Sequence, residues 1–213
     1  MPSIVIVDYG IGNLYSVQRA IEFNGFNSEI TSDEKKIMKA THVILPGVGA
    51  FALAMSELKK RGLNNILKEI ANKGTHLLGV CLGMQMLLDQ SEEFGITEGL
   101  GIIPGNVIAI PNKLKNGQKI KIPHIGWNNL LLTNDNPSWD NTVLKGIKHN
   151  DSFYFIHSYK SITKDKKNCI AQTEFGDSII DVVIMKNNVV GCQFHPEKSG
   201  IKGLDILKNF LKR

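Results

Sequence analysis

Apolar runs and helical patterns alternate along the first 90 residues. The apolar, largely β-branched runs are typical of strands buried on both faces of a parallel sheet. Between them, apolar residues recur at three- and four-residue spacing, which indicates helices. The predicted strands are residues 4–7, 26–30, 42–45 and 77–80, and the predicted helices are 14–21, 33–40 and 55–71, the last with a break at Gly62. This order predicts an α/β fold with a mostly parallel central sheet flanked by helices.

After Ser91 the pattern changes to short apolar runs between glycine-containing turns. It predicts an additional mixed or antiparallel β section, with hairpin turns at Asn116-Gly117 and Asn187-Asn188. The predicted strands are 107–110, 119–122, 128–132, 153–159, 170–173, 179–185 and 189–194, and a helix is predicted at 204–211. Because no repeat or linker interrupts the chain, we expect residues 1–213 to form a single domain.

Composition excludes several classes of protein but does not identify a function. The net charge is +5, but the lysines are scattered and only 7% of residues are aromatic, so we expect no nucleic-acid partner. Three irregularly spaced cysteines indicate neither a disulfide framework nor a metal pattern. No segment is apolar enough over a sufficient length to predict a signal peptide or a membrane span. We therefore expect a cytoplasmic protein that does not bind membranes.

Cys81 stands at the predicted junction of a strand and a helix, between Gly79 and Gly83. This is a thiol form of the nucleophile elbow, in which a sharp turn presents a reactive side chain above a parallel sheet. The glycines suit a turn with no room for side chains. By itself the segment equally fits a small buried cysteine.

A cysteine nucleophile needs a base, a group that orients the base, and donors for the oxyanion. His195 and Glu197 are two residues apart, so in an extended segment they face the same side, and Pro196 stiffens the connection. The glycines of residues 46–49 free the backbone to turn its N–H groups toward an anion. The other histidines are scattered, and we expect no metal site.

Two segments resemble the signature blocks of triad-type, class I glutamine amidotransferases: residues 79–85 and 191–197. Residues 46–49 resemble the oxyanion strand of that family. Segments 8–13, 123–128 and 155–159 further resemble the glutaminase subunits of imidazole glycerol phosphate synthases, which serve histidine biosynthesis. The resemblance extends from residue 4 to the last helix and implies a flavodoxin-like class I fold.

The resemblance implies that the chain hydrolyses L-glutamine to glutamate and ammonia without a cofactor. The implied catalytic residues are Cys81 as nucleophile, His195 as acid and base, and Glu197 as its partner. The implied oxyanion hole is Val48, Gly49 and Leu82, and the implied substrate contacts are Gly49, Gln85, Ser158 and Tyr159.

Ammonia is useful only if an acceptor site receives it, so a synthase partner is expected. The resemblance implies a heterodimer with a (β/α)8 cyclase subunit, which makes imidazole glycerol phosphate and an aminoimidazole carboxamide ribonucleotide. The candidate interface residues are Asn13, Pro123, His124 and Trp127. Trp127 could equally be core, and His124 could equally be structural.

Some segments depart from this pattern. Residues 51–55 are more apolar than expected, and residues 93–95 and 126–129 also resemble paralogues that feed ammonia to an ATP-dependent sugar amidotransferase in surface polysaccharide or flagellin glycan biosynthesis. Outside this chemistry, Cys81, His195 and Glu197 would suit a cysteine peptidase or a pyridoxal-phosphate-linked glutaminase. A binding subunit that has lost activity is the non-enzymatic alternative.

Overall fold

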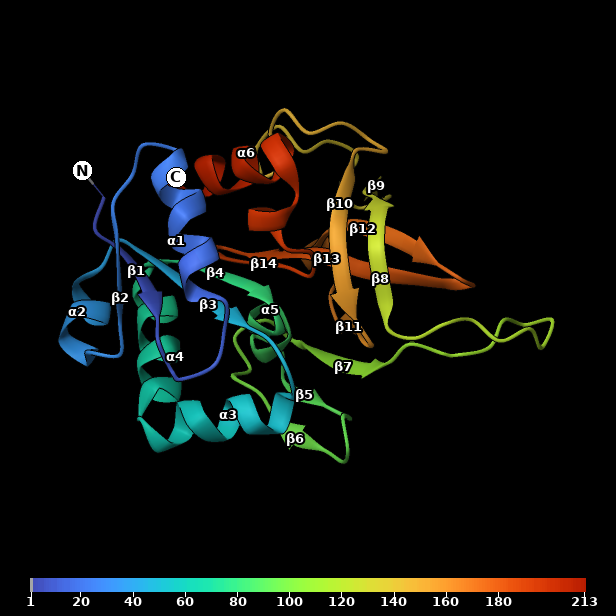
Figure 1. Ribbon diagram of the computed structural model, residues 1–213, viewed down its shortest axis with the longest axis horizontal. Coiled ribbons are helices and arrows are strands. Elements are labelled where there is room, and N and C mark those ends of the chain that lie inside the picture. Colours follow the sequence, from blue (N-terminus) through green and yellow to red (C-terminus); the bar gives the residue numbers. More distant parts are fainter. Residues whose placement is uncertain (1) are drawn as a thin grey trace.

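Five parallel strands form one half of a long sheet in the computed structural model, which describes residues 2–213 (Figure 1). They are, in spatial order, β2 (Ser28–Thr31), β1 (Ile4–Val7), β3 (His42–Gly47), β4 (His76–Cys81) and β14 (Val189–Cys192). The last of these comes from the far end of the sequence and pairs with β4. The segments that follow β14 and β4 therefore both start at the carboxyl ends of the parallel strands, where α/β folds place their ligand-binding sites.

Helices cover both faces of this half, which confirms the predicted α/β class (Figure 1). One face carries α1 (Leu14–Phe23) and α6 (Gly200–Leu211), and the other carries α2 (Glu34–Lys39), α3 (Phe51–Lys60) and α4 (Leu63–Lys73). Ile4 and Ile6 pack into the first core, whereas Val5 and Val7 pack into the second. Both faces of β1 are thus buried, which is why its sequence is continuously apolar.

The helix predicted over 55–71 is in fact two helices. α3 begins at Phe51, earlier than predicted, and Gly62 adopts a left-handed φ of 70° between α3 and α4. Glycine reaches this conformation without a side-chain clash, so the chain turns there instead of continuing the helix. At the start of α3, the Phe51 N–H donates to Glu93 Oε2 at 2.6 Å. A distant carboxylate therefore caps this helix, which local sequence patterns do not reveal.

The second half extends the sheet with short strands and adds a separate ribbon. The sheet continues through β13 (Ser178–Lys186), β11 (Tyr159–Thr163), β7 (Gly105–Ala109), β5 (Gln90–Ser91) and β6 (Thr97–Glu98), while β12 (Cys169–Phe175) pairs with β13 and β9 (Leu131–Leu132). β8 (His124–Asn129) and β10 (Ser152–His157) form an antiparallel ribbon outside it. The predicted mixed β section is confirmed.

Several predicted strands in this half have different limits. The strand predicted over 153–159 is divided at Ser158, because β10 pairs with β8 and β11 pairs with β7 and β13. No strand forms over 119–122; only a single bridge joins Lys113 and Lys119, beside a turn in which Gly117 has a φ of 86°. The segment between β7 and β8 is an extended loop that projects from the molecule (Figure 1).

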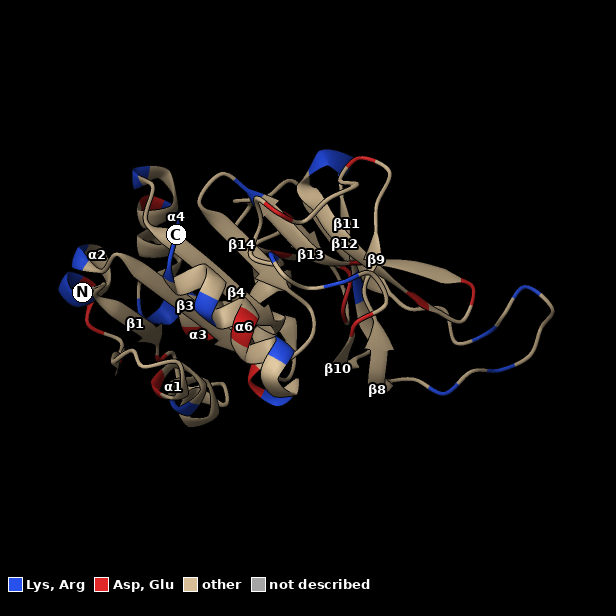
Figure 2. Ribbon diagram, turned by 90° about the horizontal axis from the view of Figure 1, so that it is seen from above, with Lys and Arg blue, Asp and Glu red and all other residues tan. Residues whose placement is uncertain are grey.

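Charged residues are distributed over both halves, and several lysines lie along the loop between β7 and β8 (Figure 2). Within residues 2–213, none of the helices combines the length and the apolar character that crossing a bilayer requires.

Candidate active site

Cys81 ends β4 at a sharp turn into the short helix α5 (Leu82–Met86). Its φ of 55° is unusual for a non-glycine residue, and such backbone conformations cost about 1–3 kcal/mol. Two close approaches maintain the turn. A Cβ on Gly83 would lie 1.8 Å from the Leu45 carbonyl oxygen, and one on Gly79 would lie 2.7 Å from the Gly83 carbonyl. Only glycines allow α5 to pack this closely on β3 and β4.

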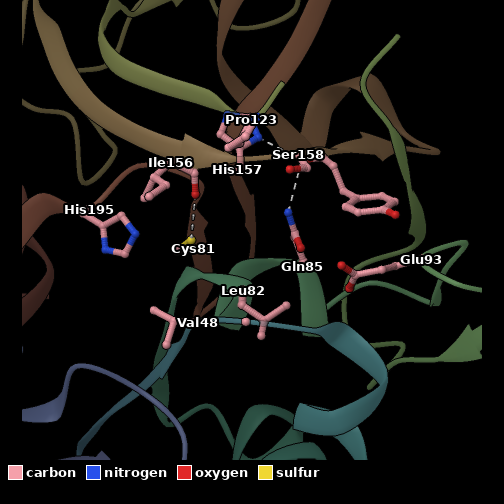
Figure 3. A pocket seen from close by; sticks show the side chains of 12 residues that line it. Val48, Cys81, Leu82, Gln85, Glu93, Pro123, Ile156, His157, Ser158 and His195 are labelled. Atoms are coloured by element: carbon pink, nitrogen blue, oxygen red, sulfur yellow. Dashed lines mark hydrogen bonds between the residues drawn. The ribbon is translucent and has the colours of Figure 1, made fainter. Parts of the chain in front are cut away.

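His195 and Glu197 follow β14, which places them beside this turn. His195 Nδ1 lies 2.7 Å from Glu197 Oε1, and both side chains are buried. In contrast, His195 Nε2 has no hydrogen-bond partner within residues 2–213. His195 and Cys81 line the same pocket, in which they lie side by side (Figure 3). One ring nitrogen is thus fixed by a carboxylate and the other is available for chemistry.

Electrostatics favour a protonated His195. Burial disfavours the charged ring, but the Cys81 sulfur and the Glu197 carboxylate outweigh burial and raise the pKa of His195 to about 10. An imidazole that retains its proton can give it to a leaving group.

The pocket above Cys81 has a volume of about 270 Å³. Pockets for drug-sized ligands usually span about 300–1,000 Å³, so this one suits a smaller molecule. Its lining includes every residue assigned from the sequence to the oxyanion hole or to substrate contacts: Val48, Gly49, Leu82, Gln85, Ser158 and Tyr159. Glu197 lies behind His195 and does not line the pocket. Side chains from β4–α5, the 46–49 segment and β10–β11 therefore converge at one sheet edge (Figure 3).

The 46–49 segment runs directly beside the elbow. Tyr9 Oη donates to the Pro46 carbonyl at 2.9 Å, and a Cβ on Gly47 would lie 2.9 Å from the Gly83 nitrogen. Gly49, shortly before α3, has a φ of 89°, a left-handed conformation that glycine adopts without a side-chain clash. Backbone N–H groups in such a segment can stabilise an oxyanion.

Gln193, Glu93 and His157 are polar residues of this region that were not among the sequence-predicted site residues. Gln193 Nε2 lies 3.9 Å from Cys81 Sγ, and Gln193 Oε1 accepts from Gln85 Nε2 at 2.9 Å. Its position two residues before His195 was the available signal, because alternate residues of an extended chain share a side. Glu93 also lines the pocket. It follows β5, whose pairing was not predictable from a two-residue pattern.

The predicted interface residues lie in two places. Asn13 borders a small recess together with His195 and Glu197, and Pro123 lines the main pocket. Trp127 is 58% exposed, which excludes the core alternative. His124 is only 4% exposed and contacts His157, so its ring is not part of a docking surface.

No group of three or more metal-binding side chains occurs in the described part of the chain. Cys169 and Cys192 are buried and free, and neither lines the pocket.

Residues 5–213 match the family model of glutamine amidotransferase class-I. The chain is 45% identical over 212 residues to imidazole glycerol phosphate synthase subunit HisH 1 of Legionella pneumophila (strain Lens), covering all of both chains. It is 49% identical to subunit HisH of Caldanaerobacter subterraneus subsp. tengcongensis, covering 97% of this chain and 96% of that protein.

Solved structures show the same fold at lower identity. The structure of PurLQS from Thermotoga maritima aligns with a TM-score of 0.71 at 18% identity, covering 99% of this chain and 98% of that chain. The glutaminase domain of CTPS from Trypanosoma brucei, with bound acivicin, aligns with a TM-score of 0.65 at 16% identity, covering 100% of this chain and 95% of that chain.

Proposed function

This chain belongs to the class-I glutamine amidotransferases, and on that premise we propose that it is the glutaminase subunit of an imidazole glycerol phosphate synthase. It releases ammonia from L-glutamine for histidine biosynthesis. One observation carries the proposal: Cys81 at its strained elbow and the buried His195–Glu197 pair meet at a pocket sized for an amino acid.

The chemistry proceeds through a thioester. The Cys81 sulfur attacks the side-chain amide carbon of glutamine, and the negative charge that develops on oxygen meets backbone N–H groups near Val48, Gly49 and Leu82. The C–N bond then breaks as protonated His195 gives its proton to the departing nitrogen, which leaves as ammonia. His195 next takes a proton from water, and the resulting hydroxide attacks the thioester to release glutamate. Glu197 stabilises the charged imidazole throughout.

Substrate recognition uses the remaining polar groups of the pocket. Gln85 and Gly49 contact the substrate, while Ser158 and Tyr159 lie at its amino-acid end. Glu93 adds a carboxylate to the pocket lining, which complements the α-ammonium group of glutamine. A neutral amide is thus held at Cys81 while a charged group is held at the opposite end.

We infer that a (β/α)8 cyclase subunit receives the ammonia in a heterodimer. The exposed face of the β8–β10 ribbon supports this, because Ile125 pairs with Ile156 and Trp127 pairs with Tyr154 in register beside the pocket. Ile125 and Trp127 are 53% and 58% exposed. Aromatic and aliphatic side chains in such a patch are typical of an interaction surface. We assign Pro123, Trp127 and Asn13 to it.

The paralogue that feeds a sugar amidotransferase is not favoured, because the relatives described above are HisH subunits that match along nearly their whole length. We also propose that residues 1–213 form one domain, which the family match over 5–213 supports. A cytoplasmic location fits three cysteines that are all free.

The test is glutamine hydrolysis with and without the cyclase subunit. We expect hydrolysis to rise strongly when the cyclase binds, and the Cys81→Ala variant to lose it. Cys169→Ala, at a buried cysteine outside the pocket, is the matched control and should retain activity. If the complex containing Cys81→Ala hydrolysed glutamine as fast as the wild type, this chain would not be the catalyst, and the alternative of a binding subunit without activity would be favoured. Full activity of the isolated chain would favour a stand-alone hydrolase. Co-purification with an ATP-pyrophosphatase partner would favour the paralogue that feeds a sugar amidotransferase.

A further inference from the structure

The inner face of the β8–β10 ribbon combines the buried Phe153 and Phe155 with polar side chains. In β8, Ile125 and Trp127 are exposed, whereas His124 is buried and Asn128 is half-buried. On the partner strand, His157 lies directly opposite His124 and is also buried. Polar side chains are uncommon on the core face of a strand. Buried imidazoles need hydrogen-bond partners, and the partners found here lead to the active site.

The hydrogen bonds of this histidine pair fix the tautomer of each ring. His157 Nδ1 lies 2.8 Å from the Tyr159 carbonyl oxygen, which can only accept, so Nδ1 carries the hydrogen. His157 Nε2 is then an acceptor, and His124 Nδ1, 3.1 Å away, is its donor. This leaves His124 Nε2 as an acceptor for the Asn128 amide at 3.4 Å. The arrangement is consistent only if both rings are neutral.

The surroundings of the rings maintain that neutral state. His124 lies between the rings of Phe155 and Phe175, at centroid distances of 5.1 and 4.1 Å. Burial lowers the pKa of both His124 and His157 to about 4. A second proton on His157 would place two N–H groups against each other and break the contact.

The same carbonyl continues the network toward the sulfur. The Tyr159 oxygen also accepts from Gln85 Nε2 at 3.2 Å, and this nitrogen donates its other hydrogen to Gln193 Oε1. The Gln193 amide is thereby oriented with Nε2 toward Cys81 Sγ, 3.9 Å away. One carbonyl oxygen therefore sets the orientation of both glutamine side chains. Both hydrogens of Gln85 Nε2 are used, so Oε1 is the atom that remains for a ligand.

We propose that His124 and His157 are positioning residues for the glutamine site. His157 fixes the Tyr159 carbonyl, which aligns Gln85 with the substrate amide and Gln193 with the nucleophile. His124 links this network to the outer face of the ribbon, since it directly precedes the exposed Ile125. This inference rests on the proposed function.

The experiment compares two polar replacements of His157 in the complex with the cyclase. His157→Asn keeps an amide N–H near the position of Nδ1, whereas His157→Gln keeps a polar group near Nε2 and loses the donor to Tyr159. We expect the KM for glutamine to rise about tenfold or more in His157→Gln, as for the loss of one hydrogen bond in a closed site, with a smaller change in kcat. His157→Asn should stay within about threefold of the wild type.

Further measurements separate positioning from a merely structural role. Product formation with added ammonium salt in place of glutamine should be unchanged in both variants, because the acceptor site lies on the cyclase. In the wild-type complex, ¹⁵N spectra should show both rings as neutral Nδ1–H tautomers. His124→Phe should also raise the KM, and it serves as a second probe if His157→Gln does not fold.

Equal KM values in the wild type, His157→Gln and His124→Phe would overturn the inference, as would an Nε2–H tautomer of His157. A failure of the proposed function is distinct from either result. In that case the wild-type complex would not hydrolyse glutamine, or Cys81→Ala would hydrolyse it, whatever residue occupies position 157.

Discussion

His195 and Glu197 are in contact across a single intervening residue, with Nδ1 and Oε1 2.7 Å apart in a buried environment. The contact uses the Nδ1 nitrogen of the imidazole and leaves Nε2 without a partner in the described chain. The carboxylate therefore determines which ring nitrogen can exchange protons with the substrate. Its own second oxygen, Oε2, is likewise buried without a partner among residues 2–213. This pair gives the most direct test of the proposed mechanism.

Replacing Glu197 by Gln should lower kcat for glutamine hydrolysis by about 100-fold or more, since the loss of the orienting acid in a triad costs up to about 10⁴. The amide has no charge to stabilise an imidazolium ion. Steady-state rates of the complex with the cyclase measure the effect. Glu22→Gln, at an exposed site on α1, should leave kcat unchanged. A kcat within threefold of the wild type in Glu197→Gln would remove Glu197 from the mechanism.

Replacing Cys81 by Ser should lower the pKa of His195 from its value of about 10, because the sulfur is the leading group that raises it. Glu197 remains in the variant and still favours the charged ring. ¹⁵N-detected titration of His195 measures the shift. Cys169→Ser, with the altered thiol in β12, should not change the titration. If the pKa were the same in Cys81→Ser, the sulfur and the ring would not interact.

Mild acid should destabilise the fold through three buried histidines. Burial lowers the pKa of His42, His124 and His157 to about 4, against an ordinary value of 6.5. Above pH 6.5 these rings are neutral in both states and have no effect. Between pH 6.5 and 4 the unfolded chain binds protons that the folded chain excludes, so stability falls.

Urea unfolding at several pH values should show an uptake of protons in that range, to which each of these three rings contributes up to about one. The His157→Asn variant should show about one proton fewer. A stability that is constant between pH 6.5 and 5 would contradict this account.

Two glycine substitutions should separate crowding from backbone strain. In Gly83→Ala the new Cβ would lie 1.8 Å from a backbone oxygen, so we expect a loss of at least about 3 kcal/mol, the upper end for overpacking. Gly62 has a φ of 70° but open space around it, so Gly62→Ala should cost only about 1–2 kcal/mol. Denaturant unfolding measures both. Equal losses would mean that the elbow relaxes around the methyl group.

Trp127→Ala should weaken binding of the cyclase by at least about 30-fold, because truncating a central interface aromatic costs about 2 kcal/mol or more. Titration calorimetry of the two subunits measures the affinity. Phe23 is 71% exposed at the last position of α1 and provides a matched aromatic control that should not affect binding. Unchanged affinity in Trp127→Ala would place the interface elsewhere.

The sequence predicts much of this architecture because several features are local. The elbow around Cys81 depends on neighbouring glycines, and the His195–Glu197 contact depends on a two-residue spacing. The continuous apolar run of β1 indicates burial on both faces, because a strand with one face in solvent would alternate apolar and polar residues. In each case the residues that determine the geometry are adjacent in the chain.

Features that depend on distant pairing could not be predicted. The strand over 153–159 divides at Ser158 because its two parts pair with different strands. His124 suggests a surface residue when read beside Trp127, but its ring is directed inward to His157, 33 positions away. The roles of Gln193 and Glu93 likewise depend on Gln85 and Phe51, which approach them only in the folded chain.

The backbone geometry at Cys81 has a consequence for how such a protein can evolve. The φ of 55° occurs where Gly79 and Gly83 let the backbone of α5 approach β3 and β4, whereas the Cys81 sulfur makes only long contacts of 3.9 Å to the Ile156 carbonyl and the Gln193 amide. The backbone geometry of the elbow therefore depends on the glycines, whereas its reactivity depends on the side chain at position 81. A single codon change at position 81 would abolish turnover and leave a receptor that still recognises glutamine, whereas a change at either flanking glycine would remove the receptor as well.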